Sequence, residues 1–354
     1  MSAPRRTTFL SAAIALATVP MTGTACAQGA PPASSAAGYH VTRHVTTGGE
    51  GGWDYLVVDT AAHRLWVTRG SHVQVLDTDH DSLVGDVPNT PGVHGVALAP
   101  ALGRAFTSNG RDSTVTIVDV KTLAPIATVK VTGRNPDAIL YEPATHRVFT
   151  FNGGSADATA LDAATGAVVG TIPLGGKPEF AVAQGDGRVF VNIEDRSEIV
   201  AFDARTLAVQ ARWPLAPCEE PTGLAIDRAH GRLFAGCSNA LMAVVDTKSG
   251  HVVATPPIGK GVDGTAFDPA SQLAFASNGE GTLTVVHEDA PDRYRVVATV
   301  PTQRGARTLA LDERTHRIYT VTAQFGPPPA PTPERPRPRP AMVPGTFTVL
   351  VVER

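Results

Sequence analysis

A pattern of four short β-strands recurs along this chain, and this recurrence restricts the fold more than any other feature. In one copy the strands are expected at 96–99, 104–108, 114–118 and 126–131, separated by Gly, Asn, Asp and Pro. Short segments rich in Val, Ile, Thr and Phe between such turn residues are typical of antiparallel sheets. One four-stranded sheet cannot bury both of its faces, so the copies must pack against each other.

Seven copies of this pattern are present. Their first segments begin 40 to 44 residues apart, at Trp53, Val93, Pro136, Pro178, Pro221, Val262 and Ala306. Seven repeats of this period predict an all-β fold, a seven-bladed β-propeller with one four-stranded antiparallel blade per copy. The last copy has no fourth strand, whereas a strand-like segment at 40–47 precedes the first copy. We expect this N-terminal strand to complete the last blade and close the ring, which leaves no long sheet edge exposed.

The repeat also resembles a known family. The segment FTSNGRDSTVTIVDVKTLAPIATVKV at 106–131 is similar to the YVTN-type repeat of YncE-like seven-bladed propellers. These are secreted bacterial proteins related in fold to lactonase and surface-layer propellers. The resemblance extends over all seven copies, from about residue 39 to the end, and it implies the fold without implying one particular activity.

The N-terminus has the features of an export signal. Arg5 and Arg6 precede an apolar run at 9–19 and an A-x-A sequence at 25–27, which together predict a signal peptide over 1–27. The apolar run is too short to span a membrane. We therefore expect a periplasmic or secreted protein, and the two arginines leave both the Sec and the twin-arginine export routes open.

The rest of the chain divides simply. The segment 28–38 is rich in Pro, Ala and Ser and is expected to be a disordered lead-in. A single propeller should then occupy 39–354, interrupted in its last blade by a proline-rich insertion at 326–345. This insertion could arch over the central channel as a stiff polyproline lid, dock a partner, or be a disordered surface segment.

Charge and composition exclude several classes of partner. Removal of the signal peptide would leave 28 basic and 33 acidic residues and a net charge of −5. This balance argues against nonspecific binding to nucleic acid or to anionic membranes. No later apolar stretch could form a transmembrane segment. A monomer with a small polar ligand or an envelope protein as its partner fits these features.

Two cysteines remain in the mature sequence. Cys218 precedes the first strand of the fifth copy and Cys237 follows its second strand, so both should lie at the same end of that blade. An exported protein can oxidise such a pair, and we predict a disulfide. A metal-binding thiolate pair is the alternative, but no histidine stands nearby at ligand spacing.

One repeated position carries ionisable residues that strand propensity does not require. It lies immediately before the first strand in each copy and is occupied by Asp54, His94, Asp137, Glu179, Thr222, Asp263 and Arg307. Because the first strand of a blade lines the central channel, these side chains should form a ring at one mouth. Asp54, Asp137, Glu179 and Asp263 could bind a divalent cation such as Ca²⁺ or Mg²⁺. The alternative is a solvated mouth whose charges compensate each other.

Loops between the second and third strands should open on the same face. They carry candidate ligand-binding residues, namely Asn109, Arg111, Asn152 and Asn278. The hairpins at the opposite end carry recurring histidines, for which we expect a structural or solvated role: His63, His146, His230 and His316.

Two functions fit these patterns. The first is a binding or scaffold protein that holds a small polar ligand, a metal ion or a protein partner at the mouth. The second is a metal-dependent hydrolase or lyase of the lactonase type, with His94 as the candidate base. The chain has no G-x-S-x-G, H-E-x-x-H or Walker motif and no C-x-x-C-H haem site, so neither haem nor a nucleotide is expected.

Overall fold

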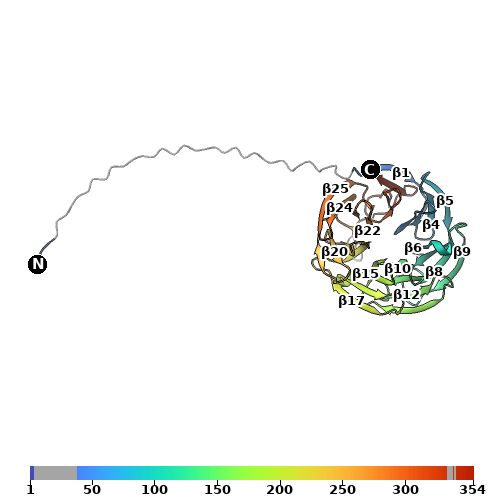
Figure 1. Cartoon of the computed structure of the whole chain (residues 1–354). Helices are drawn as coiled ribbons and strands as arrows, with labels where there is room; N and C mark the ends of the chain where they lie inside the picture. Colours follow the sequence, from blue (N-terminus) through green and yellow to red (C-terminus); the bar gives the residue numbers. More distant parts are fainter. Residues whose placement is uncertain (4–37, 333–337, 339) are drawn as a thin grey trace. The chain divides into compact units, whose positions relative to one another are not determined.

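The repeats form seven four-stranded antiparallel sheets around a central axis in the computed structural model (Figure 1). The structure describes residues 1–3, 38–332, 338 and 340–354. The predicted signal peptide and lead-in therefore lie almost entirely outside the described residues. The chain divides into two units, Met1–Pro32 and Ala33–Arg354, and the propeller belongs to the second.

Each of blades one to six uses four consecutive strands. Blades one to three consist of β2 (Leu56–Asp59), β3 (Arg64–Thr68), β4 (Val73–Asp77), β5 (Ser82–Val87); β6 (Val93–Ala99), β7 (Arg104–Asn109), β8 (Thr114–Asp119), β9 (Pro125–Lys130); and β10 (Pro136–Glu142), β11 (Arg147–Asn152), β12 (Asp157–Asp162), β13 (Val168–Pro173). Blades four to six consist of β14 (Pro178–Ala183), β15 (Arg188–Ile193), β16 (Glu198–Asp203), β17 (Val209–Pro214); β18 (Pro221–Asp227), β19 (Arg232–Cys237), β20 (Leu241–Asp246), β21 (Val252–Ala254); and β22 (Val262–Asp268), β23 (Leu273–Asn278), β24 (Thr282–Ala290), β25 (Arg293–Pro301).

The seventh blade joins the two ends of the propeller. It contains β26 (Leu309–Asp312), β27 (Arg317–Thr322), β28 (Thr348–Glu353) and, as its outermost strand, β1 (His40–Thr46). β1 pairs with β28 in an antiparallel register. The first strands of adjacent blades contact each other in turn, and β26 also contacts β2. The predicted closure of the ring by the N-terminal strand is therefore confirmed.

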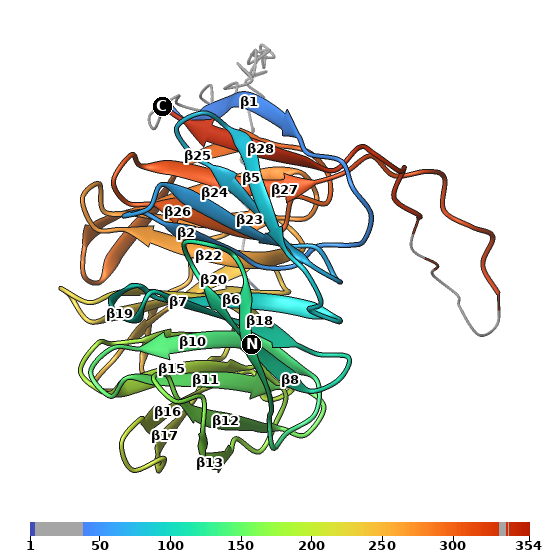
Figure 2. The same ribbon diagram turned by 90° about the vertical axis from the view of Figure 1, so that its right-hand side faces the viewer.

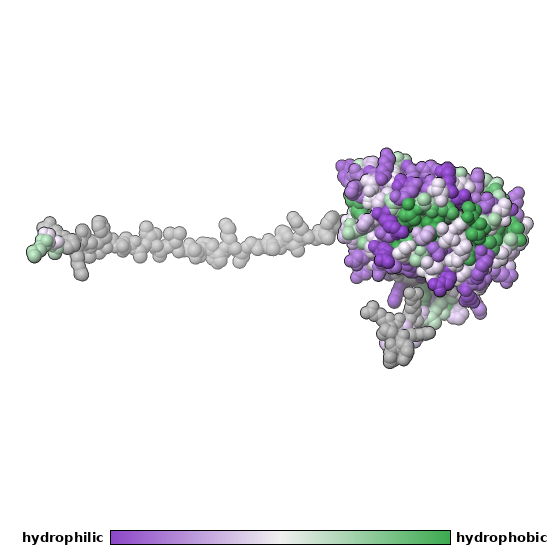
Figure 3. Space-filling view, turned by 90° about the horizontal axis from the view of Figure 1, so that it is seen from below, coloured by the Kyte–Doolittle hydropathy of each residue, from purple (hydrophilic) through white to green (hydrophobic). Residues whose placement is uncertain are grey.

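An aromatic residue in the second strand of every blade fills the space between neighbouring sheets. It is the third residue of the strand and is no more than 1% exposed in all seven blades: Trp66, Phe106, Phe149, Phe190, Phe234, Phe275 and Tyr319. Burial of one such side chain stabilises the fold by roughly 1.5–3 kcal/mol. The outermost strands, by contrast, place apolar residues such as Ile126, Val168 and Val169 in solvent. Apolar and polar side chains are mixed on the part of the rim seen in Figure 3.

An arginine at the start of the second strand links each of five blades to the next. Its guanidinium donates to the carbonyl of the residue that follows the third strand there: Arg64 to Val120, Arg104 to Ala163, Arg147 to Ala204, Arg188 to Thr247 and Arg317 to Thr78. We call this contact the inter-blade latch. In blade five the Nε of Arg232 donates at 2.7 Å to the carbonyl of Pro291, which lies three residues beyond the counterpart position, Glu288, because β24 is longer than the other third strands. Blade six has Leu273 at this position.

A carboxylate closes the outer hairpin of each of five blades. It ends the third strand and accepts hydrogen bonds from backbone N–H groups two and three residues later: Asp77, Asp119, Asp162, Asp203 and Asp246. This is the turn chemistry expected of Asp. The need to close this turn explains why Asp recurs at the end of the third strand, and no catalytic or binding role is required.

The predicted disulfide is present. Cys218 and Cys237 are bonded, and both side chains are buried next to β18. The bond therefore ties the segment before this inner strand to the end of β19.

The proline-rich insertion leaves the ring between β27 and β28. Phe325 and Met342 form an isolated antiparallel β-bridge, and the N–H of Gly326 donates to the carbonyl of Ala341 at 2.9 Å. Figure 2 shows the described parts of this segment standing out from one face of the ring. Among the described residues, no helix is long and apolar enough to cross a membrane.

Candidate functional site at the channel mouth

A bulge at the start of the innermost strand positions the ring residues. In five blades the pairing with the second strand shifts register at the ring position or next to it, which affects His94, Asp137, Glu179, Thr222 and Asp263. Asp54 and Arg307 lie just before β2 and β26. A bulge bends the strand and redirects a side chain, and such bulges are common beside active sites. Here they coincide with the position that carries charge.

Six of the seven ring residues line one cavity of about 680 Å³, and the seventh, His94, contacts Asp54 at its wall. The cavity lining contains five acidic and three basic residues: Asp54, Asp137, Glu179, Glu194, Asp263, Lys177, Arg304 and Arg307. The predicted ring at one mouth is thus a shared cavity in the structure. Its carboxylates divide into three groups.

Asp54, His94 and Asp137 form the first group. The Nδ1 of His94 lies 2.6 Å from Oδ2 of Asp54 and 3.6 Å from Oδ1 of Asp137. Burial opposes protonation of His94, but the hydrogen bond to Asp54 and the charge of Asp137 outweigh it and raise the pKa of His94. Burial, with Asp54 and Asp263 nearby, raises the pKa of Asp137 to about 6 although His94 opposes the shift.

The second group is an ion pair across the last two blades. The Nε of Arg307 lies 2.5 Å from Oδ2 of Asp263, and its Nη2 lies 3.7 Å from Oδ1 of Asp54. Burial raises the pKa of Asp263 even though Arg307 opposes that shift. Arg307 therefore acts as a counter-ion for Asp263 and reaches toward the first group.

Lys177 organises the third group. Its Nζ lies 2.7 Å from Oε1 of Glu179 and also bonds the carboxylate of Glu194. The hydroxyl of Tyr55 donates to Glu179 at 3.4 Å. Burial and the charge of Asp137 raise the pKa of Glu179 to about 8, in spite of Lys177. Asp137 and Glu179 thus hold protons that ordinary carboxyls release near pH 4.

One side of the cavity is apolar. Trp53 packs against Phe325 with ring centroids 6.0 Å apart, and Phe325, Pro340 and Met342 all line the cavity. Three of these residues belong to the insertion or stand next to it. The described ends of the insertion therefore form part of the cavity wall.

Tyr55 separates this cavity from the channel below it. The tyrosine lines both the mouth cavity and a second cavity of about 710 Å³ that runs between the inner strands of blades one to four. Its ring packs edge-on against Phe180 at 5.1 Å. Tyr55 therefore lies at the boundary between the two cavities, and Phe180 packs against it from the side of the second cavity.

The structure does not bring the predicted outer tier to the cavity. The asparagine amides are buried inside their blades, where each donates to side-chain oxygens at the start of the third strand or just inside it: Asn109 to Thr114 and Thr116, Asn152 to Asp157 and Thr159, Asn278 to Thr282 and Thr284. Arg111 is exposed and does not line the cavity. These amides hold the second and third strands together.

Several lining residues were not singled out from the sequence. Lys177 stands two residues before Glu179, and Trp53 directly precedes Asp54, so proximity to the ring position was the available signal. Arg304 and Met342 reach the cavity from loops, and the repeat pattern gives no register for loops.

The comparisons with known proteins identify the architecture. No model of a protein family matches the chain, and no curated protein sequence matches it. A solved structure described as Kuenenia stuttgartiensis hydrazine synthase matches with a TM-score of 0.67 and 15% identity, covering 77% of this chain and 92% of that chain.

Two further solved structures match over most of their length. The WD40 repeats of RRP9 match with a TM-score of 0.73 and 9% identity over 89% of this chain and 97% of that chain. The structure of U3-55K matches with a TM-score of 0.72 and 9% identity over 88% and 98% of the two chains. At such low identities the likeness shows a seven-bladed propeller fold alone. Membership of the YncE-like family stays a prediction.

Proposed function

We propose that this propeller is a binding protein whose mouth cavity holds a small, positively charged ligand. The observation that carries the proposal is the set of buried carboxyls in one cavity, five acids against three bases. Burial of a carboxylate is costly unless a cation neutralises it. The raised pKa values of Asp137 and Glu179 express that cost. A bound cation would replace the protons that these groups otherwise retain.

Two kinds of cation have the required chemistry. A divalent ion could bind Asp54, His94 and Asp137, whose ligand atoms lie within 4.8 Å of one another. A small organic ammonium could contact the same carboxylates and place its apolar part on Trp53 and Phe325. The shared requirement is positive charge at the first group.

Calorimetry on the mature chain tests this proposal. Ca²⁺, Mg²⁺, Mn²⁺ and Zn²⁺ form one arm, and a panel of small primary and quaternary amines in the presence of a chelator forms the other. Asp137→Asn should abolish binding of whichever cation the parent protein binds. Glu280→Gln, a change on an exposed loop, should leave that binding unchanged. If no cation of either arm binds or changes the melting temperature, the proposal is wrong.

Metal-assisted hydrolysis is a second candidate. It is favoured by the 2.6 Å contact between His94 and Asp54, because a carboxylate that orients an imidazole is a common arrangement for a general base. A panel of lactones and esters assayed with each divalent ion tests it. Turnover should disappear in His94→Gln, and absence of turnover with every ion would remove this candidate.

We also propose a location outside the cytoplasm. The Cys218–Cys237 disulfide supports it, since such bonds persist in oxidising compartments. The test is fractionation of cells that produce the full chain, followed by thiol labelling. Recovery of the protein in the cytoplasm with both thiols reduced would contradict this location.

A further inference from the structure

A carboxylate occupies a position in blade six that is uncharged in blades one to five. The position directly follows the third strand in blades one to five and lies within the longer β24 in blade six. In each of these blades its N–H donates to the carbonyl of a residue of positive φ in the first hairpin of the same blade. Its occupants in blades one to six are Thr78, Val120, Ala163, Ala204, Thr247 and Glu288. The backbone geometry is shared, so it gives no reason for an acid in one blade only.

Glu288 is buried, and the described residues satisfy its carboxylate poorly. The residue is 1% exposed, and within the described part of the chain neither carboxylate oxygen accepts a well-formed hydrogen bond; Oε1 has an ion-pair contact with His230. A buried carboxylate left in this state is strongly destabilising, while Thr or Ala at the same position is not. The residue therefore imposes an energetic cost that a bound group can offset.

The neighbouring hairpin of blade five is also unlike its counterparts. In blades one, three and seven a histidine occupies the left-handed position, namely His63 (φ 54°), His146 (φ 53°) and His316 (φ 58°). In blade five that position is taken by Gly231 (φ 66°), and the histidine stands one residue earlier as His230. From this position the imidazole of His230 contacts Glu288 of blade six.

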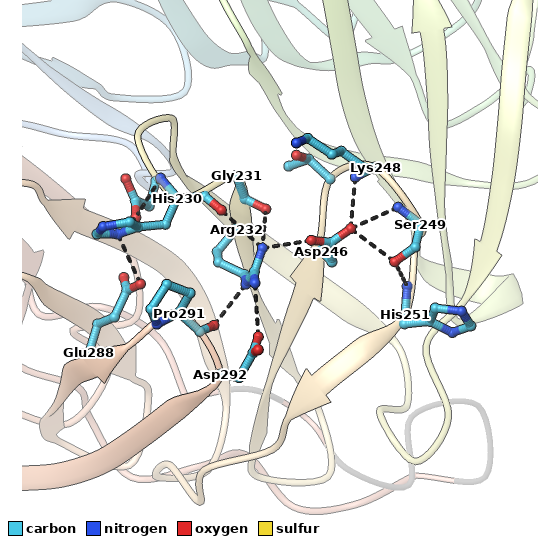
Figure 4. Close-up of polar contacts among 12 residues, drawn as sticks. His230, Gly231, Arg232, Asp246, Lys248, Ser249, His251, Glu288, Pro291 and Asp292 are labelled. Carbon is cyan, nitrogen blue, oxygen red and sulfur yellow. Dashed lines mark hydrogen bonds and ion pairs between the residues drawn. The ribbon is translucent and has the colours of Figure 1, made fainter.

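Three ligand atoms converge as a result. The Nδ1 of His230 lies 2.6 Å from Oδ2 of Asp227 and 3.1 Å from Oε1 of Glu288. The ligand atoms of the three residues all lie within 4.8 Å of one another. Figure 4 shows Glu288 pointing toward His230 across the boundary between the blades. One N–H at Nδ1 cannot serve both carboxylates.

Arg232, which pairs with Asp227 across β18 and β19, does not neutralise this cluster. Arg232 donates to Asp246 at 2.6 Å, to Asp292 at 2.8 Å and to the Pro291 carbonyl at 2.7 Å (Figure 4). Its charge is therefore used by two other carboxylates. Asp227 and Glu288 are thus two carboxyls that face a single imidazole.

We propose that Asp227, His230 and Glu288 bind a divalent metal ion between blades five and six, at the end of the propeller opposite the mouth. β18 has Thr222 near its first residue, in the mouth cavity, and ends at Asp227, which places the two sites at opposite ends of one strand. One imidazole nitrogen and two carboxylate oxygens suit Zn²⁺ or Mn²⁺ better than Ca²⁺, which prefers oxygen ligands alone.

The geometry admits the ion with small movements. Ligand distances near 2.0–2.2 Å are typical of such ions, so His230 and Asp227 would separate slightly as the metal enters between them. His230 is partly exposed, which gives an entry path from solvent, whereas both acids are buried. The ion would join two blades where the inter-blade latch is displaced to Pro291. Its role is therefore structural.

Metal titration of the intact mature protein tests the proposal. Zn²⁺ and Mn²⁺ should raise the melting temperature, and Co²⁺ should give a visible absorption band from a site with an imidazole ligand. Glu288→Thr, which installs the residue of blade five, and His230→Asn should each weaken binding roughly tenfold or more. The matched control His146→Asn changes the corresponding hairpin of blade three and should leave binding intact.

A second background separates this site from the mouth. Asp137→Asn removes the proposed cation site at the mouth. Any Zn²⁺-dependent stabilisation that this variant retains therefore belongs to the site formed by Glu288, Asp227 and His230. Glu288→Thr should fold with or without metal, because the substitution removes a buried charge. If Zn²⁺ stabilises Glu288→Thr as much as the parent chain, the proposed site does not exist.

Discussion

Replacement of Arg147 by alanine should loosen the contact between blades three and four. Its Nη1 donates to the carbonyl of Ala204 at 2.5 Å and to that of Arg205 at 2.9 Å. Ala204 is fully buried, so its carbonyl would lose a charged partner in a place that water reaches poorly. A hydrogen bond to a charged group contributes about 1.5–3 kcal/mol when buried. Arg147 is only half-buried, and we therefore expect a loss of roughly 1–2 kcal/mol.

Urea unfolding followed by fluorescence and circular dichroism measures this loss. Arg147→Met keeps the alkyl stem and removes the donors, so it separates packing from hydrogen bonding. Arg196→Ala, an exposed residue of the same charge, should change stability by no more than about 0.5 kcal/mol. Amide exchange should also quicken at the boundary of the two blades and not elsewhere.

The result that refutes this reasoning is equally specific. If Arg147→Ala unfolds at the same urea concentration as Arg196→Ala, the guanidinium contributes nothing across the blades. The recurrence of arginine at this strand position would then need another explanation.

Three further predictions concern the mouth and the covalent link. Folded Asp137 and Glu179 keep protons up to about pH 6 and about pH 8, whereas the unfolded chain releases them near pH 4. Stability in chelator should therefore fall as pH rises from 5 to 8, by at most about 1.4 kcal/mol per pH unit and proton. Glu179→Gln should flatten the upper part of this decline, and a stability that rises with pH would contradict the assignment. Reduction of Cys218–Cys237, or replacement of both by Ser, should lower the free energy of unfolding by about 3 kcal/mol; an unchanged denaturation midpoint would contradict this. Deletion of 327–343 removes part of the cavity wall and should weaken cation binding roughly tenfold, the equivalent of about 1.4 kcal/mol, and unchanged affinity measured by calorimetry would rule out a role for the insertion.

Much of the fold could be predicted because the information is repeated. A strand of five residues in one copy is ambiguous, but seven copies in the same order leave one arrangement. The seam formed by β1 and the turn role of Asp119 follow from the same alignment of copies. The ring position could be predicted from the same alignment, because residues at one repeated position lie at the same distance from the propeller axis.

The parts that were not predicted depend on geometry that the repeat does not encode. The sequence presents Asn109 and Asn152 as loop residues, yet both are the last residues of their strands and bond third-strand side chains. The pairing of basic with acidic side chains could not be predicted either, because the loop that places Lys177 beside Glu179 has no register in the repeat. Glu288 differs from its counterparts in blades one to five, and only an inter-blade contact reveals what faces it.

The seam between β1 and β28 has a consequence for the order of events during folding. Thr42 on β1 bonds the backbone of Val351, which is 309 positions away along the chain. Loop closure over such a distance is slow, and it cannot begin before the C-terminal residues have been synthesised. Blades one to six can assemble as the chain grows, yet the circle stays open until its last segment arrives. Loss of β1, or of the last residues of β28, should therefore leave a chain with a persistent opening at blade seven.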